Sequence, residues 1–119
     1  YGLPGQFAPI ADFTLLETAV GVARAMGVEM PVGNLLSSDT FYDASNSTMK
    51  WAEMGVLAVE MEAAALYMTA AKLGKRALAI CSISDSIVTG EELSAADRQT
   101  TFTTMMEIAL KTAVQMEGK

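Results

Sequence analysis

The chain has 119 residues, of which 51% are hydrophobic and 18% are charged, and its formal net charge is −6. This composition is typical of an ordered globular chain with enough residues for one domain. The negative charge argues against a nucleic-acid partner, because proteins that bind a phosphate backbone carry basic patches. The absence of histidine excludes histidine triads, histidine metal sites and a histidine base within these residues.

Cysteine content and hydropathy bear on the compartment. Cys81 is the only cysteine, which excludes an internal disulfide and fits a reducing compartment such as the cytoplasm. No apolar run is long enough to cross a bilayer, so no membrane partner is expected, and no signal-peptide pattern opens the sequence. The opening Tyr1-Gly2-Leu3-Pro4-Gly5 reads as a loop already under way. We therefore expect a fragment, or one piece of a longer polypeptide.

The first two expected elements are a helix and a strand. The helix is expected over residues 13–26, with Asp12 as its N-cap and Gly27 as its stop, because apolar residues recur there at helical spacing. The strand is expected over residues 30–36. Its Gly33 either weakens the strand or lets another group approach closely.

An aromatic loop and a short helix follow. Phe41 and Tyr42 are explained by edge packing, or by stacking of a flat ring on a planar ligand. The turn-rich polar stretch over residues 43–47 leads into a short helix over residues 48–54.

Two carboxylates, Glu60 and Glu62, flank Met61 after a short apolar strand over residues 56–59. The helix expected over residues 63–72 is apolar nearly all round, which predicts burial. Carboxylates are rarely buried without a partner, so the two glutamates either occupy a helix start, where they favour the helix dipole, or face a ligand. If the backbone is still extended through residue 62, both carboxylates point to one face and can accept hydrogen bonds from a sugar diol. The sequence alone leaves both interpretations open.

A second strand is expected over residues 76–83, which form a near-continuous apolar run. Such a run predicts a strand buried on both faces, as in a parallel sheet with helices on each side. The run ends at Ser84-Asp85-Ser86, and ligands of open α/β sheets bind outside the carboxyl ends of the strands. Asp85 is therefore a candidate functional group, although an ordinary turn or capping aspartate explains it as well.

The last helix is expected over residues 95–116 and begins with a capping box in Ser94-Ala95-Ala96-Asp97. Arg98 lies near its first turn, where a cation opposes the helix dipole, so this arginine is either solvated or reaches a carboxylate. The alternation of strands and helices predicts an α/β fold. One apolar face is expected along the last helix, made of Phe102, Met105, Met106, Ala109, Leu110, Ala113 and Val114.

Three stretches together resemble the bacterial, hexameric type of purine nucleoside phosphorylase: Val59-Glu60-Met61-Glu62-Ala63-Ala64, Ser84-Asp85 followed by Thr89-Gly90-Glu91, and Arg98-Gln99-Thr100-Thr101-Phe102. Residues 34–39 and Phe41-Tyr42 are similar to the same family, and the similarity keeps its order over nearly the whole chain. The resemblance implies a three-layer α/β fold with a mixed central sheet flanked by helices. Residues 1–119 would then be the C-terminal half of a single domain whose N-terminal half is absent from this chain.

The resemblance also implies roles for individual residues. Asp85 would be the general acid, and Arg98 would pair with it during the reaction. Glu62 would take the sugar hydroxyls. The implied substrate-binding residues are Phe41 and Val59 at the purine, Glu60, Met61 and Glu62 at the ribose and the edge of the base, and Ser84 facing the base.

These roles are chemically coherent. Phosphorolysis breaks a C–N glycosidic bond, and the departing purine gathers negative charge that a carboxylic acid can neutralise, for a contribution of about 10²–10⁴-fold. Such an acid must start protonated, which predicts a buried position for Asp85.

The implied activity is the reversible phosphorolysis of purine (deoxy)ribonucleosides by a pentosyltransferase, within a homo-oligomer that is a hexamer in the family. Phosphate would be the co-substrate, with no metal and no organic cofactor. The family binds phosphate through a glycine and arginines of the missing half, and it uses a histidine from a neighbouring subunit. We therefore expect activity only when a complementary N-terminal-half chain is present.

Two features leave other functions open. The glutamate–methionine–glutamate signature is shared with methylthioadenosine/S-adenosylhomocysteine nucleosidases, in which water replaces phosphate, whereas the stretch that begins at Arg98 favours the phosphorylase. Ser86 stands where the family has a histidine, which puts the tuning of the catalytic aspartate in doubt. A third possibility is a non-catalytic fragment that retains the nucleoside pocket.

Overall fold

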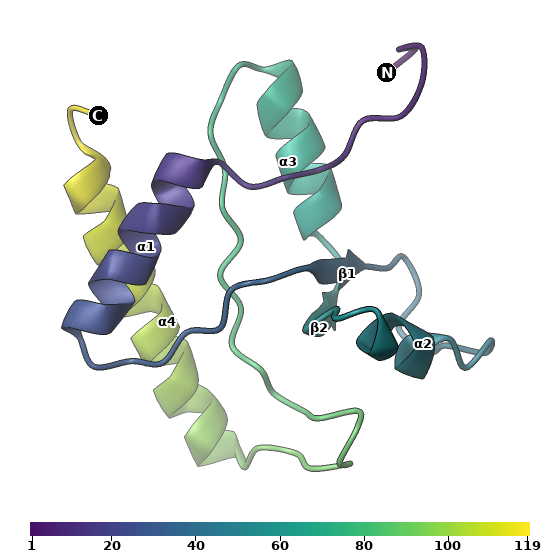
Figure 1. Ribbon diagram of the computed structural model, residues 1–119. Coiled ribbons are helices and arrows are strands. Elements are labelled where there is room, and N and C mark those ends of the chain that lie inside the picture. The colour runs from purple at the N-terminus through teal and green to yellow at the C-terminus, as the bar shows by residue number, and fades with distance from the viewer.

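The computed structural model describes residues 1–119 as four helices and one small parallel sheet in an open, flat arrangement (Figure 1). Helices α1 and α4 lie side by side, and α3 and the sheet with α2 stand on the other side of an extended segment (Figure 1). The elements in chain order are α1 (Phe13–Ala25), β1 (Leu35–Ser37), α2 (Thr48–Glu53), β2 (Ala58–Glu60), α3 (Ala63–Lys72) and α4 (Ala95–Met116).

Local sequence signals set the helix ends, and all four expected helices are confirmed to within one residue. The Asp12 carboxylate accepts a hydrogen bond from the Leu15 amide at 2.9 Å and so caps α1. At the start of α4 the Ser94 hydroxyl accepts from the Asp97 amide at 3.1 Å and donates to the Asp97 carboxylate at 2.6 Å, which confirms the capping box. None of the helices combines the length and the apolar character that crossing a membrane requires.

The sheet is shorter than the sequence predicts. β1 and β2 pair in parallel over three residue pairs, Leu35 with Ala58, Leu36 with Val59 and Ser37 with Glu60. Both strands therefore lie nearer to the C-terminus than expected, and the mixed sheet is represented in this chain by one parallel pair and one isolated antiparallel bridge.

Gly33 lies against Leu57, as the close-approach interpretation of this glycine predicts. A Cβ placed at residue 33 would lie 2.6 Å from Leu57 Cδ1. The missing side chain lets the two segments meet just before β1 and β2 begin to pair.

The strand predicted over residues 76–83 is not formed. This stretch runs extended between the two helix groups (Figure 1), but no neighbouring strand pairs with it. Its backbone is held instead by single contacts: the Asp12 amide donates to the Ala77 carbonyl at 3.0 Å, and the Tyr67 hydroxyl accepts from the Ala79 amide at 2.9 Å. A strand buried on both faces needs a neighbour on each side, and the chain supplies neither.

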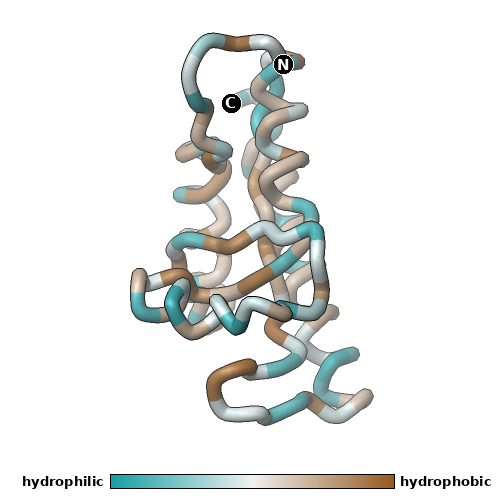
Figure 2. Tube along the Cα trace, turned by 90° about the vertical axis from the view of Figure 1, so that its right-hand side faces the viewer, coloured by the Kyte–Doolittle hydropathy of each residue, from teal (hydrophilic) through white to brown (hydrophobic).

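The core of the chain is small. Val22, Ala23 and Ile108 form its buried centre between α1 and α4, and only eight residues of the chain are buried. The accessible surface is 8877 Å², roughly 2,700 Å² more than the roughly 6,200 Å² expected of a compact chain of this mass. Residues coloured as hydrophobic are spread along helices and connecting segments rather than gathered at one centre (Figure 2).

The expected burial of α3 is therefore wrong for this chain, and the expected apolar face of α4 is left mostly uncovered. Only Ala63 and Ala70 are buried in α3, and Leu66 is 45% exposed. In α4 the side chains that face the core belong to Ile108 and Thr112, whereas the predicted apolar face is largely exposed, with Leu110 68% accessible. The apolar sequence pattern is present, but the surfaces that would cover it are not supplied by these residues.

Two glycines of the α1 region should respond in opposite directions to alanine. Gly21 lies exposed within α1, and a methyl group added there would meet no atom within 4 Å, so Gly21→Ala should stabilise the fold by about 1 kcal/mol through helix propensity. Gly27 has φ of +70°, so Gly27→Ala should destabilise it by about 1–2 kcal/mol. Urea unfolding followed by far-UV circular dichroism measures both, and shifts of the same sign would contradict the α1 boundary.

Candidate active site

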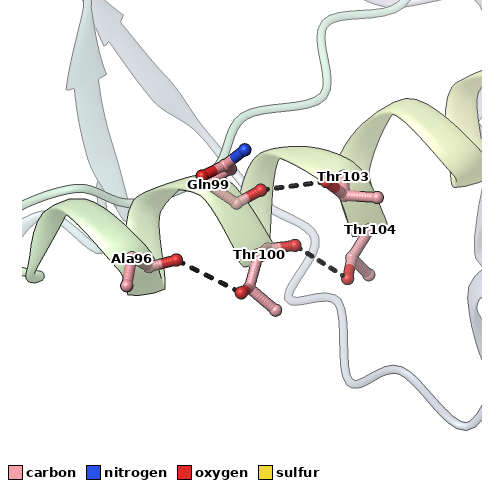
Figure 3. A pocket seen from close by; sticks show the side chains of 5 residues that line it. All are labelled: Ala96, Gln99, Thr100, Thr103 and Thr104. Carbon is pink, nitrogen blue, oxygen red and sulfur yellow. Dashed lines mark hydrogen bonds between the residues drawn. The ribbon is translucent and has the colours of Figure 1, made fainter.

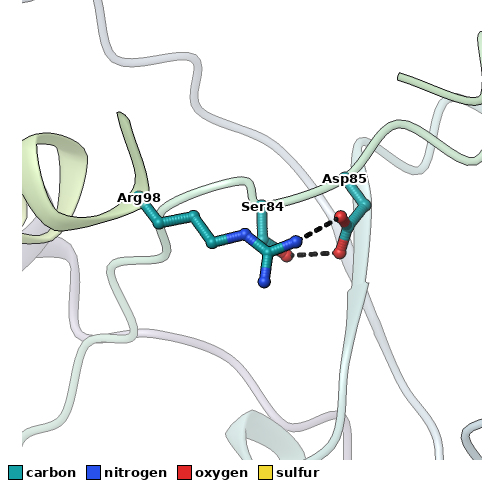
Figure 4. Close-up of polar contacts among 3 residues, drawn as sticks. All are labelled: Ser84, Asp85 and Arg98. Carbon is teal, nitrogen blue, oxygen red and sulfur yellow. Dashed lines mark hydrogen bonds and ion pairs between the residues drawn. The ribbon is translucent and has the colours of Figure 1, made fainter. Parts of the chain in front are cut away.

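Ser84, Asp85 and Arg98 lie together where the extended segment ends and α4 begins (Figure 4). Arg98 Nη2 donates to Asp85 Oδ1 at 3.1 Å, and the Ser84 hydroxyl donates to Asp85 Oδ2 at 2.7 Å. Both oxygens of the carboxylate thus have a donor. The side chains of Arg98 and Asp85 are 40% and 45% exposed, so the expected burial of Asp85 is absent in this chain. No packed sheet surrounds the end of the extended segment, and the aspartate therefore stays open to solvent.

The loop between Asp85 and Arg98 folds back on itself and brings the pair together. Asp85 and Glu92 form an antiparallel bridge, the Ser86 amide donates to the Glu91 carbonyl at 2.7 Å, and the Leu93 amide donates to the Ser84 carbonyl at 2.9 Å. The start of α4 is thereby tied back to the aspartate. These backbone hydrogen bonds hold the two side chains of the ion pair within reach of one another.

The ion pair uses only part of the guanidinium. Arg98 contacts Asp85 through Nη2 alone, and its Nε is inaccessible to solvent and has no hydrogen-bond partner. An arginine can bind a carboxylate through two parallel N–H donors. The arrangement in Figure 4 therefore leaves donor capacity on Arg98 beyond its single bond to Asp85.

Glu60 is bound to the start of α3. Its Oε2 accepts hydrogen bonds from the amides of Glu62 at 2.7 Å and Ala63 at 2.6 Å, and its Oε1 accepts a hydrogen bond from the Ser37 hydroxyl. Burial acts to raise the pKa of Glu60, but the hydrogen bonds from Ser37 and from the backbone outweigh it and hold the pKa below its ordinary value. Glu60 thus satisfies the start of α3, as the helix-start interpretation predicts.

Glu62 behaves differently from Glu60. It occupies the N-cap position of α3 with φ of −129° and ψ of −27°, so the backbone is no longer extended there and the two carboxylates do not share a strand face. Its side chain caps nothing and is exposed, with one long contact of 3.3 Å from the Met61 amide. The carboxylate of Glu62 is therefore accessible at the surface.

The aromatic pair lies on the loop after β1. The rings of Phe41 and Tyr42 meet edge to face, with centroids 5.1 Å apart and an interplanar angle of 79°. Phe41 is 78% exposed, so no other part of this chain covers the ring. Edge packing against the chain is therefore not what holds Phe41.

Asp43 secures the end of this aromatic loop, a role that the sequence pattern does not reveal. Its carboxylate accepts from the Ser45 amide at 3.0 Å, from the Thr48 amide at 2.9 Å and from the hydroxyls of Ser45, Ser47 and Thr48. The hydrogen bond from Ser45 does most to hold the pKa of Asp43 far below its usual range; desolvation opposes it, and the bonds from Thr48 and Ser47 add to the lowering. An aspartate followed by alternating serines just before a helix is the sequence feature behind this role, but such residues are too common in loops for the feature to identify it.

Val59 and Cys81 complete the surroundings of the glutamates. Val59 lies on β2 and is 42% exposed. Burial, and then the charges of Glu60 and Glu62, raise the pKa of the Cys81 thiol. The extended segment thus passes near the two glutamates on its way to Ser84 and Asp85.

Two open hollows lie elsewhere on the surface. One, of about 460 Å³, runs along the first half of α4 (Figure 3), where the hydroxyls of Thr100, Thr103 and Thr104 donate to carbonyls of the preceding turn. These hydroxyls are engaged by their own helix, and no charged group lines the hollow. The other hollow lies between the start of α1 and α3. Neither contains a predicted site residue.

Residues 1–116 match the family model of the phosphorylase superfamily. The chain belongs to the phosphorylase superfamily. The DeoD-type purine nucleoside phosphorylase of Clostridium novyi (strain NT) is 54% identical over 109 residues, which cover 91% of this chain and 47% of that protein. The protein of the same name from Geobacillus sp. (strain WCH70) is 50% identical over 111 residues, covering 93% of this chain and 47% of the relative.

The fold of this superfamily chain matches a solved structure of the P knowlesi homologue of P falciparum PNP, with a TM-score of 0.79 at 22% sequence identity. The match covers 96% of this chain and 46% of that one. The fold is therefore the α/β fold of a nucleoside phosphorylase, as expected. The chain spans about half the length of the curated relatives it matches.

The Arg98–Asp85 ion pair should add little to stability, because exposed ion pairs contribute about 0–1 kcal/mol. Arg98→Ala should lower the free energy of unfolding by no more than about 1 kcal/mol, measured by urea unfolding. Lys111→Ala is the matched control, since Lys111 forms the other exposed ion pair of α4, with Glu107 at 2.7 Å. A loss several times larger for Arg98→Ala would mean that the arginine is a structural residue.

Proposed function

We propose that this chain is the C-terminal half of a purine nucleoside phosphorylase subunit, which catalyses the reversible phosphorolysis of purine (deoxy)ribonucleosides to free base and (deoxy)ribose 1-phosphate. The observation that carries the proposal is the agreement between two facts. The chain is about half identical to DeoD-type purine nucleoside phosphorylases along nearly its whole length. It also holds Ser84, Asp85 and Arg98 in one hydrogen-bonded group.

In the proposed reaction phosphate bonds to the sugar carbon as the glycosidic C–N bond breaks, and Asp85, which enters this step as the protonated acid, gives its proton to the departing purine. The base leaves with developing negative charge, and protonation neutralises it. Arg98 then stabilises the aspartate anion that remains, and its unused N–H donors allow a second bond to the carboxylate as charge develops there. Ser84 donates to the other oxygen and so sets the orientation of the carboxyl group.

The proposed substrate site extends from Asp85 toward the end of β2. The Glu62 carboxylate accepts hydrogen bonds from the sugar hydroxyls, and Met61 lies beside the ribose. Phe41 and Val59 line the purine with apolar surface. This assignment is supported by the exposure of all four side chains, because each has surface that a ligand can cover.

Completion of the site requires the other half of the domain. The excess surface of roughly 2,700 Å² is of the size that permanent complexes bury. We propose that a complementary N-terminal-half chain covers α3, residues 76–83 and the outer face of α4, and that it supplies the phosphate ligands. The completed subunit works in the cytoplasm as part of a homo-oligomer, with phosphate as co-substrate and no metal or organic cofactor.

The reaction should consume phosphate. The chain, co-expressed with the N-terminal half of the Clostridium novyi relative, should convert inosine or adenosine to ribose 1-phosphate only in phosphate buffer. The chain alone should be inactive in the same assay. Free ribose released at an equal rate without phosphate would move the assignment to a nucleosidase, and nucleoside binding without any turnover would move it to a non-catalytic fragment.

Asp85 and Arg98 should act as one catalytic unit. Asp85→Asn and Arg98→Ala should each lower kcat/KM for one purine nucleoside by about 10²-fold or more, because both act on the same proton transfer. The double variant should be little worse than Asp85→Asn alone, since residues that act as a unit show non-additive losses. Lys111→Ala serves as the control with unchanged rates. Strictly additive penalties would assign Arg98 to the solvated helix surface.

A further inference from the structure

The start of α3 has an unusual set of hydrogen-bond partners. The first N–H groups of a helix have no partner inside the helix and are usually satisfied by the N-cap side chain. Here the N-cap residue is Glu62, and its own side chain makes no capping bond. The amides of Glu62, Ala63 and Ala64 donate instead to two side chains from the strand ends.

Those two side chains belong to Ser37 and Glu60, which are direct neighbours in the β1–β2 ladder. Glu60 Oε2 accepts from the amides of Glu62 and Ala63, and Ser37 Oγ accepts from the Ala64 amide at 2.9 Å. Ser37 also donates to Glu60 Oε1, so the hydroxyl joins the carboxylate to the helix start. One serine and one glutamate thereby tie β1, β2 and α3 together.

These hydrogen bonds fix the backbone of Glu62 and leave its side chain without a capping role. Its backbone amide is held by Glu60 at 2.7 Å, while its carboxylate points outward without a capping role. A negative charge at a helix N-terminus is stabilising, so Glu60 suits this structural position. With Glu60 engaged by the helix and the strand, Glu62 is left as the ligand-facing member of the pair.

We propose that Ser37 and Glu60 are positioning residues that fix Glu62 for recognition of the sugar. This inference rests on the proposed function for its activity readout. Ser37 acts through Glu60 and the start of α3, and so through the placement of Glu62.

The first test is a pair of double-mutant cycles in the chain co-expressed with its complementary half. Ser37→Ala and Glu60→Gln should each lower kcat/KM for inosine by about tenfold, the loss of one charge-assisted hydrogen bond, mainly by raising KM. In a Glu62→Ala background each should add less than about twofold, because the group that they position is gone. Full retention of either penalty in that background would overturn the proposal.

Two further variants test whether the loss of activity is specific to the Ser37 hydroxyl. Ser37→Thr keeps the hydroxyl and should retain most of the activity. Ser38→Ala is the matched control, since the neighbouring Ser38 hydroxyl contacts only Thr40, and it should behave as the parent protein. Equal losses in Ser37→Ala and Ser38→Ala would overturn the positioning role.

The second test does not depend on turnover. Amide hydrogen exchange on the same purified protein should be at least about tenfold faster at Ala64 in Ser37→Ala and at Ala63 in Glu60→Ala, and unchanged at both in Glu62→Ala. Unchanged exchange at Ala64 in Ser37→Ala would overturn the proposal that Ser37 and Glu60 hold the start of α3, even in an active enzyme. Faster exchange in a protein that lacks phosphorolysis would keep the pair and reject the proposed function instead.

The pH dependence gives a further readout. The lowered pKa of Glu60 contributes stability above its ordinary value of 4.5, and this contribution is lost as the pH falls through the lower pKa of the folded state. Glu60→Gln should therefore be less stable than the parent at pH 7, with the difference shrinking below about pH 4. A difference that is the same at pH 7 and at pH 3 would contradict the ionised Glu60 on which the pair depends.

Discussion

β1 and β2 are joined over three residue pairs, and the last pair, Ser37 with Glu60, stands where both strands end. Because neighbours in a parallel ladder have a fixed spacing, the hydroxyl and the carboxylate are brought into contact by the backbone itself. From that point Glu60 reaches the first amides of α3. A slip of one residue would turn every side chain of a strand to the opposite face, and α3 would lose its acceptors. The direction of α3 and the orientation of Glu62 both follow from this short ladder.

Short-range hydrogen bonds also build the region around Asp85. The loop between Asp85 and Arg98 is closed by backbone hydrogen bonds of its own, and Ser94 caps the helix that carries the arginine. Both polar groups of the site are thus built by contacts between residues that lie close in sequence, apart from the β1–β2 pairing. The apolar side chains of its helices and extended segment, in contrast, are largely left exposed by the rest of the chain. Local hydrogen bonding and long-range packing are separable here, and the chain keeps the first without the second.

The sequence predicts the helices well because their signals are local. Asp12, Ser94 and the spacing of apolar residues fix helix ends through contacts within a few residues of the chain. The strand over residues 76–83 could not form, because its pattern describes a strand inside a sheet and pairing needs a second backbone. The helix α3 and the Leu110 face of α4 are largely exposed for a related reason, since the rest of this chain covers little of them. Composition records the environment of the finished domain, whereas the fold of these residues alone reflects what they can contact.

The candidate site residues differ in the same way: some have a local sequence signal, and others are distinguished only by the three-dimensional structure. Asp85 and Arg98 stand out in the sequence by their place after an apolar run and at a helix start, and the two side chains do meet. The different tasks of Glu60 and Glu62 cannot be separated from their spacing, because the answer depends on the residue at which the backbone leaves the strand. Ser37 and Asp43 do not stand out, because serines and aspartates are common in loops, and only the three-dimensional bonds distinguish these two from their neighbours.

The position of Cys81 has a consequence for the chemical durability of the molecule. Oxidants and alkylating agents attack the thiolate, and partial burial, with the charges of Glu60 and Glu62, raises the pKa of that thiol and so lowers its thiolate fraction. The two acids therefore also lower the reactivity of the one cysteine through which two such chains could be cross-linked. A change that neutralises either acid would make the thiol more reactive, so the resistance of the protein to covalent modification depends in part on the charges at the start of α3.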